Sequence, residues 1–362
     1  MNKAHYIIPI FVPHEGCPHD CVFCNQNSIT GSSTKVTAQF VINTVEEYIK
    51  TIPKTNRTLE ISFFGGTFTA INIEKQNELL KIAKHYKDLN IIDYIRLSTR
   101  PDYINDDILL NLNKFSVDII ELGVQSLDNE VLHKSARGHS VEDVIKASKL
   151  IKKYGFILGH QIMLGLPGDN FEKDIKTTQE IIKLSPDICR IYPSLVIKDT
   201  PMEVMYKQGT YTPYTLEEAV KISKIIYGML IVNNINVIRL GLQPTEEINE
   251  GGDIVTGPFH PAFRELVEGS IINDIIRDEV PSSYSGILKI YINPKDISKL
   301  YASKKKFFND TLKQLKTINV IVNQLDSVNR GELMLSYNDN CITMSIYDYF
   351  ASKYKEGYSH IL

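Results

Sequence analysis

The sequence is short of three features, and each shortage excludes a class of protein. No window approaches the roughly 18 consecutive apolar residues of a transmembrane helix, and the N-terminal apolar stretch is broken by Pro9. Five cysteines are few, and an odd number, for a disulfide scaffold. A formal net charge of −3 supplies no global basic field for nucleic acid. We therefore expect a cytoplasmic protein with reduced thiols and no membrane partner.

The composition is otherwise that of an ordinary globular protein, and predicted strands and helices alternate along the chain. The 362 residues are 43% hydrophobic and 23% charged, enough for one large domain or two to three smaller ones. Short apolar runs predict strands at residues 7–12, 59–64, 94–99, 119–123, 157–163 and 188–192. Amphipathic stretches between them predict helices at residues 37–52, 72–88, 106–113, 128–133, 141–153 and 171–184.

This alternation predicts parallel βαβ units. The strand runs are almost continuously apolar, as is typical of parallel strands covered on both faces. Taken alone, the pattern fits either an open doubly wound sheet or an incomplete (β/α) barrel. In both architectures, functional side chains lie at the carboxyl ends of the strands.

The last part of the chain has a different character. Strand, helix and strand patterns after about residue 285 predict a small α+β module, with one helix over residues 296–315. We therefore predict two domains, one formed by residues 1–270 and the other by residues 271–362. Residues 282–362 contain eleven basic and seven acidic side chains, a balance of +4. Lys304–Lys306 followed by Phe307 and Phe308 suit contacts with phosphates and bases, although the simpler interpretation is a solvated helix face.

Three of the five cysteines, Cys17, Cys21 and Cys24, fall within eight residues, with the spacing C-x3-C-x2-C. They follow the first predicted strand, where a loop can gather thiolates around a soft metal centre. A structural zinc site usually takes four ligands, so a fourth would come from His14, His19 or a distant residue. Three thiolates instead suit a four-iron cluster with one iron open to another ligand. The other two cysteines, Cys189 and Cys341, read as small buried side chains.

Polar residues or glycines follow several of the predicted strands. Glycines allow positive φ and close approach of the backbone to a ligand, and hydroxyl, guanidinium and carboxylate groups bind ribose or carboxylate. Arg137 is expected either at a ligand carboxylate or paired with Glu121, and His160 reads as a satisfied barrel residue. The candidate binding residues are Gly65, Gly66, Thr67, Ser98, Arg100, Glu121, Gln125, Arg137, Gln161 and Met163.

The cysteine spacing, with Phe23 before the last cysteine, resembles the radical S-adenosylmethionine (SAM) superfamily. The resemblance implies a partial (β/α)6 barrel of TIM type and a [4Fe-4S] cluster on the three cysteines. It also implies SAM bound by Phe23 and the ten residues named above. In that superfamily an electron from the cluster cleaves SAM, and the resulting 5′-deoxyadenosyl radical abstracts hydrogen from the substrate. An electron donor such as ferredoxin or flavodoxin is then expected.

Five segments resemble the catalytic-subunit family of Elongator more specifically: residues 63–69, 98–102, 121–126, 137–139 and 190–197. The resemblance covers about residues 5–270 and implies tRNA, or another RNA, as substrate. Elongator-type enzymes carry a C-terminal acetyltransferase domain, whereas only 80 residues follow Ser282 here. Two alternatives stay open. One is oxidation or alkylation of a small molecule, as in the oxygen-independent coproporphyrinogen oxidases, and the other is a non-catalytic RNA-binding iron–sulfur protein.

Overall fold

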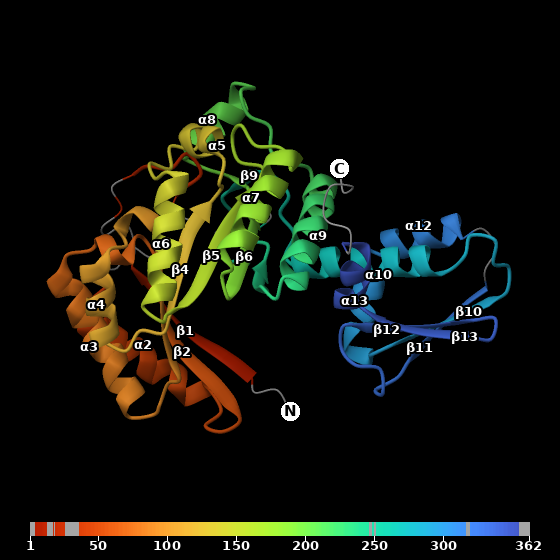
Figure 1. Ribbon diagram of the computed structural model, residues 1–362, viewed down its shortest axis with the longest axis horizontal. Coiled ribbons are helices and arrows are strands. Elements are labelled where there is room, and N and C mark those ends of the chain that lie inside the picture. Colours follow the sequence, from red (N-terminus) through yellow and green to blue (C-terminus); the bar gives the residue numbers. More distant parts are fainter. Residues whose placement is uncertain are drawn as a thin grey trace. The chain divides into compact units, whose positions relative to one another are not determined.

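The computed structural model describes residues 4–12, 17, 19–25, 36–245, 248–249, 251–315 and 319–354. The chain divides into two compact units, shown in Figure 1. The first contains residues 1–214 and 243–258, and the second contains residues 215–242 and 259–362. A boundary at residue 270 remains a prediction. No described helix has both the length and the apolar character needed to cross a membrane.

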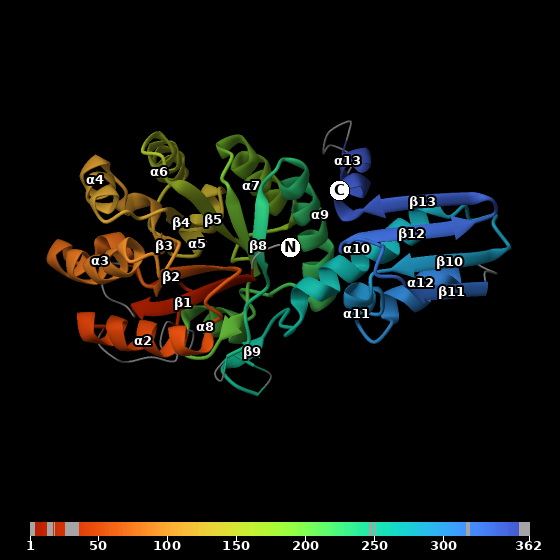
Figure 2. The same ribbon diagram turned by 90° about the horizontal axis from the view of Figure 1, so that it is seen from below.

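The first unit is built on parallel strands that lie side by side in chain order. These strands are β1 (Ala4–Val12), β2 (Arg57–Gly65), β3 (Tyr94–Thr99), β4 (Ile119–Gln125), β5 (Ile157–Leu164) and β6 (Ile188–Pro193). Figure 2 shows the curvature of this sheet, with α3, α4, α6 and α7 on its outer side. The predicted partial (β/α)6 barrel is confirmed.

Helices connect these strands at the predicted places. They are α2 (Ala38–Thr51), α3 (Ile73–Asp88), α4 (Asp106–Lys114), α5 (Asn129–Lys134), α6 (Val141–Lys153) and α7 (Phe171–Leu184), with short 3-10 turns η1 (Phe68–Ala70) and η2 (Pro101–Tyr103). Side-chain caps fix where they begin. Thr37 accepts a hydrogen bond from the amide of Phe40, and Ser140 with Asp143 forms a capping box at α6.

The two faces of the sheet differ in chemistry. The face toward the helices is apolar, and Leu97, Leu122 and Ile191 on it are fully buried. His160 lies on this face and shares a hydrogen bond of 2.8 Å with Ser148 of α6. Burial lowers the pKa of His160 to about 3, so the imidazole is neutral. The opposite face carries polar side chains from five neighbouring strands: Glu60, Ser62, Arg96, Ser98, Glu121, Gln161 and Arg190.

A smaller substructure completes the first unit. The strands β7 (Val196–Ile197) and β9 (Ile254–Thr256) form an antiparallel pair, and α8 (Pro201–Lys207) follows β7. Gly257 has φ of +120° just after β9, and a Cβ there would lie 3.2 Å from the backbone of Leu195. The glycine therefore lets these two backbone segments pack closely.

The second unit contains two long helices and a mixed sheet. Its helices are α9 (Leu216–Val232), α10 (Phe263–Glu279), α11 (Ile297–Leu300), α12 (Lys306–Gln314) and α13 (Ile346–Lys353), with a 3-10 turn η3 (Pro294–Asp296). Its strands are β8 (Asn236–Leu240), β10 (Ile287–Ile292), β11 (Asn319–Gln324), β12 (Glu332–Tyr337) and β13 (Asn340–Ser345). The last four form a sheet in the order β11-β10-β12-β13.

Two predictions for this unit were wrong. The single helix expected over residues 296–315 is divided into α11 and α12, because Ser303, Lys304 and Lys305 all adopt left-handed backbone conformations. Cys341 is exposed, not buried, because it lies on β13 at the edge of the sheet. Cys189 is buried as predicted, on the helix-covered face of the barrel, and burial raises the pKa of its thiol.

Candidate active site

The cysteine segment follows β1 at the carboxyl edge of the parallel sheet. Val12, the last residue of β1, is in register with Gly65 at the end of β2, and the amide of Gly66 donates to the carbonyl of Val12 at 2.9 Å. Cys21 is buried, with 3% of its surface exposed, whereas Cys17 and Cys24 are half-buried. The strand end that precedes the three predicted metal ligands therefore lies next to the predicted Gly-Gly turn.

Backbone hydrogen bonds on both sides fix the middle of this segment. The amide of Val22 donates to the carbonyl of Ser135 at 3.1 Å, and the amide of Met202 donates to the carbonyl of Val22 at 2.9 Å. The Val22 side chain packs in a buried cluster with Val196, Met202 and Tyr211, and Phe23 packs against that cluster. Phe23, a predicted SAM contact, is half-buried and lies between Cys21 and Cys24 in the sequence.

Arg137 connects the cysteine segment to β4. One terminal nitrogen of its guanidinium donates to the sulfur of Cys21 at 3.4 Å, and the other donates to the carbonyl of Gly123 at 2.6 Å. Arg137 thereby holds the cysteine segment against β4. The alternative pairing of Arg137 with Glu121 was wrong, because Glu121 is bound by two other arginines.

Several predicted cofactor residues carry buried polar atoms that have no hydrogen-bond partner among the described residues. Arg100 is 2% exposed and binds Asp102 through two nitrogens at 2.9 and 3.0 Å, which leaves its third nitrogen unpaired. The side-chain oxygen of Gln125 and the Nε of Arg137 are likewise unpaired. Buried polar groups normally have partners, so these three atoms are suited to a polar ligand.

The Gly-Gly-Thr turn after β2 requires glycine at its first position. Gly65 has φ of +105°, and a Cβ there would lie 2.8 Å from the carbonyl oxygen of Val12. Thr67, two residues on, is 2% exposed, and its carbonyl accepts a hydrogen bond from Ala70 at 3.0 Å. Exposed Gly65 and half-buried Gly66 therefore offer backbone to a ligand at the strand end, while Thr67 anchors the turn.

Below this edge, a chain of buried ion pairs crosses the polar face of the sheet. Arg96 lies between Glu60, at 2.9 Å, and Glu121, with which it also forms a close ion pair. Arg190 binds the same Glu121 carboxylate through two nitrogens, at 2.7 and 3.0 Å. Burial alone would raise the pKa of Glu121, but the charges of Arg190 and Arg96 outweigh it and hold that pKa below its ordinary value.

The remaining predicted cofactor residues adjoin this ion-pair chain. Gln161 donates to Glu121 at 2.8 Å and to Ser98 at 3.3 Å, and Met163 lies two residues further along β5 on the same face. Glu60 and Arg96 were not among the residues predicted from the sequence. The available signal was a charged residue in the middle of an otherwise apolar strand, which is costly unless it is paired.

The donor set fits a [4Fe-4S] cluster and SAM. Three thiols lie in one short segment, and the guanidinium of Arg137 contacts one of them. Unpaired polar atoms belong to Arg100 and Gln125, at the ends of β3 and β4, and to Arg137, in the loop after α5. Within the described ranges, no three Cys, His, Asp or Glu side chains converge as ligands of a single ion. The fit therefore rests on the chemistry and placement of the donors.

A buried pair of carboxyl groups, which was not predicted from the sequence, follows β5. Asp169, in the loop before α7, and Asp174, on α7, share a hydrogen bond. The hydroxyl of Tyr214 donates to Asp174 at 2.9 Å. Burial raises the pKa of Asp169 to about 6 and raises the pKa of Asp174, next to the charge of Asp169, well above its usual range. The pair therefore holds a proton at weakly acidic pH.

This pair predicts a pH dependence of stability. Because the pKa in the folded state exceeds that of an unfolded aspartate, about 3.9, the pair stabilises the fold at low pH. That contribution falls as pH rises through about 6. We expect Asp169→Asn to reduce the fall in melting temperature between about pH 4 and about pH 7. Thermal denaturation of both proteins across this range, with exposed Asp88→Asn as control, measures the effect; equal slopes for all three would contradict it.

Comparison with known proteins agrees with this geometry. The radical SAM superfamily matches residues 11–181, and the radical SAM C-terminal domain matches residues 186–273. The chain is 32% identical over 256 residues to a tRNA uridine(34) acetyltransferase of Methanocaldococcus jannaschii, covering 60% of this chain and 47% of that protein. It is 33% identical to an uncharacterized protein of the same organism, covering 58% of this chain and 67% of that protein.

More distant relatives extend the comparison. Human Elongator complex protein 3 is 27% identical over 205 residues, which cover 51% of this chain and 37% of that protein. The solved structure of Methanocaldococcus infernus Elp3 with an N-terminal deletion shares the fold, with a TM-score of 0.62 at 23% identity over 94% of this chain and 75% of that one. The chain spans about half the length of the tRNA uridine(34) acetyltransferases from Methanocaldococcus that it matches. With its cysteine segment at the carboxyl edge of a partial barrel and with Elp3-like relatives, this chain belongs to the radical SAM superfamily.

Proposed function

We propose that this radical SAM enzyme modifies RNA, and that its substrate is a tRNA. The observation that carries the radical chemistry is the position of Cys21, buried at the carboxyl edge of the sheet and bound by Arg137. The substrate class is supported by relatives: those named for tRNA uridine(34) match 60% of this chain, and the Elongator proteins match about half.

In this proposal, Cys17, Cys21 and Cys24 hold a [4Fe-4S] cluster, and the strand ends hold SAM. When bound, these groups supply a 5′-deoxyadenosyl radical that abstracts a hydrogen atom from the substrate. The protein orients both groups and excludes water from them. The predicted SAM contacts remain Phe23, Gly65, Gly66, Thr67, Ser98, Arg100, Glu121, Gln125, Arg137, Gln161 and Met163.

The side chains around the cysteines have different roles in this proposal. Arg137 donates to the sulfur of Cys21 and to the carbonyl of Gly123, and so holds the cysteine segment against β4. Arg100 is held by Asp102 with one nitrogen left over, which suits a carboxylate or a ribose oxygen. Two arginines and Gln161 bind Glu121, so we assign to it the additional role of holding β3, β4 and β6 together and orienting Gln161.

Mass spectrometry of tRNA nucleosides tests the substrate class. A strain that lacks this protein should lose one modified nucleoside, and the wild-type gene should restore it, whereas a Cys21→Ala gene should not. Unchanged tRNA nucleosides in the deletion strain would contradict the proposal. A changed small-molecule pool with unchanged RNA would favour the alternative of small-molecule oxidation or alkylation.

A further inference from the structure

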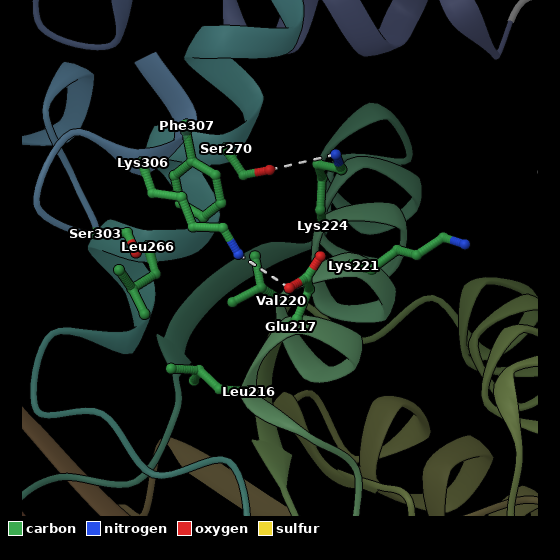
Figure 3. A pocket seen from close by; sticks show the side chains of 10 residues that line it. All are labelled: Leu216, Glu217, Val220, Lys221, Lys224, Leu266, Ser270, Ser303, Lys306 and Phe307. Atoms are coloured by element: carbon green, nitrogen blue, oxygen red, sulfur yellow. Dashed lines mark hydrogen bonds and ion pairs between the residues drawn. The ribbon is translucent and has the colours of Figure 1, made fainter. Parts of the chain in front are cut away.

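The second unit contains a pocket of about 340 Å3, shown in Figure 3. Its size is at the lower end of small-molecule sites, which span about 300–1,000 Å3. Helices α9 and α10 and the turn that enters α12 form its walls. Its lining combines apolar and basic side chains, among them Val220, Lys221, Lys224, Leu266, Lys306 and Phe307.

The lysines of this pocket have different roles. Lys224 is fixed as part of the wall, because it forms a close ion pair with Asp274 and donates to Ser270 at 3.3 Å. Lys306 reaches across the pocket to Glu217 at 3.0 Å, as Figure 3 shows. Both of these side chains are largely exposed, at 54% and 82%. Such surface pairs are weak and are screened by salt, so a phosphate can replace Glu217 as the partner of Lys306.

The two phenylalanines at the start of α12 face different environments. Phe308 is buried at 8% exposure and packs edge-on against Tyr301, with ring centroids 5.2 Å apart. Phe307 is half-buried and lines the pocket. An aromatic ring beside basic side chains is the arrangement on which unpaired bases stack while lysines bind the phosphate.

The backbone that presents these groups is strained. Ser303, Lys304 and Lys305 have φ values of 54°, 52° and 67°, and none is glycine. Left-handed residues of this kind are unfavourable and persist only where surrounding structure holds them. Here the amide of Lys305 donates to the carbonyl of Tyr301 at 2.9 Å, and the Lys305 ammonium lies 4.6 Å from the Tyr301 ring. The turn thus holds Lys306 and Phe307 at the pocket wall.

We propose that this pocket binds one unpaired nucleotide of the RNA substrate, with its base on Phe307 and its phosphate at Lys306. The inference rests on the proposed function, since it presumes an RNA substrate. It adds an anchoring site built from residues of the second unit, whereas the residues assigned to the cluster and SAM belong to the first unit.

Fluorescence anisotropy of the full-length protein with a labelled single-stranded RNA tests this site. Phe307→Ala should weaken binding at least about five-fold, and Phe307→Tyr should retain most of it. Lys306→Ala should lower the slope of log affinity against log salt by about 0.7. Glu217→Gln should tighten binding, because it removes the carboxylate that competes with phosphate. Lys313→Ala, an exposed lysine on the same helix, is the matched control and should leave the affinity closest to wild type.

The outcomes separate this site from the proposed function. If the wild-type protein binds RNA and the Phe307, Lys306 and Glu217 variants match Lys313→Ala, the pocket assignment is overturned while the RNA substrate stands. If the wild-type protein binds no RNA, both proposals are overturned. Release of 5′-deoxyadenosine without RNA should be equal in all these variants, which shows that the radical SAM site is intact.

Discussion

Replacement of Glu121 with alanine is expected to lower the free energy of unfolding by about 3–5 kcal/mol. Glu121 is 1% exposed and is the shared partner of Arg96 and Arg190, which are themselves buried. Without it, two guanidinium groups remain in the barrel with too few acceptors, because Glu60 contacts Arg96 but forms no ion pair with Arg190 among the described residues. Desolvated charges without partners are among the costliest defects in a protein core.

Equilibrium unfolding in urea measures this loss. Glu130→Ala is a matched control, because Glu130 also binds two lysines, Lys134 and Lys173, but lies at the surface. Glu130→Ala should lower the free energy of unfolding by far less than Glu121→Ala, since exposed ion pairs contribute little to stability. Equal destabilisation by the two substitutions would show that the buried ion-pair chain does not hold the strands of the barrel together.

Replacement of Cys21 with alanine is expected to abolish iron binding and the formation of 5′-deoxyadenosine. Each thiolate of a three-cysteine site is needed to hold the cluster, and Cys21 is the most buried of the three. Cys17→Ala and Cys24→Ala should behave in the same way. Iron and sulfide content after anaerobic reconstitution, together with the electron paramagnetic resonance signal of the reduced protein, measures the effect.

Cys341→Ala is the control for this series. Cys341 is exposed on β13 in the second unit, so its loss should leave iron content and activity unchanged. If Cys21→Ala retained as much iron as Cys341→Ala, the cluster would not be held by the cysteine segment. A purely structural role of Cys21 would lower stability but not the iron content of the folded fraction.

The sequence predicted the barrel well because its signal is local. Apolar runs of strand length alternate with capped amphipathic helices, and this alternation leads to parallel βα units. The expectation that the cysteines lie near the Gly-Gly turn has the same origin, since both follow strands whose carboxyl ends meet at one edge. Strand order in the first unit is chain order, which placed neighbouring motifs together.

The features that the sequence did not predict depend on register and on long-range packing. The ion pairs of Glu121 with Arg96 and Arg190 become visible only when the strands are aligned. Similarly, Asp169 and Asp174 are unremarkable acidic residues until the loop and α7 bury them beside Tyr214. The break between α11 and α12 lacks glycine or proline, so the positive φ of Lys304 and its neighbours left no local signal.

Release of 5′-deoxyadenosine is the most direct test of the central claim, that this chain cleaves SAM at Cys17, Cys21 and Cys24. The full-length protein is reconstituted with iron and sulfide under anaerobic conditions, reduced with dithionite and mixed with SAM, and the product is quantified by mass spectrometry. We expect 5′-deoxyadenosine from the wild-type protein and only background from Cys21→Ala. A reconstituted and reduced wild-type protein that releases none would contradict the claim.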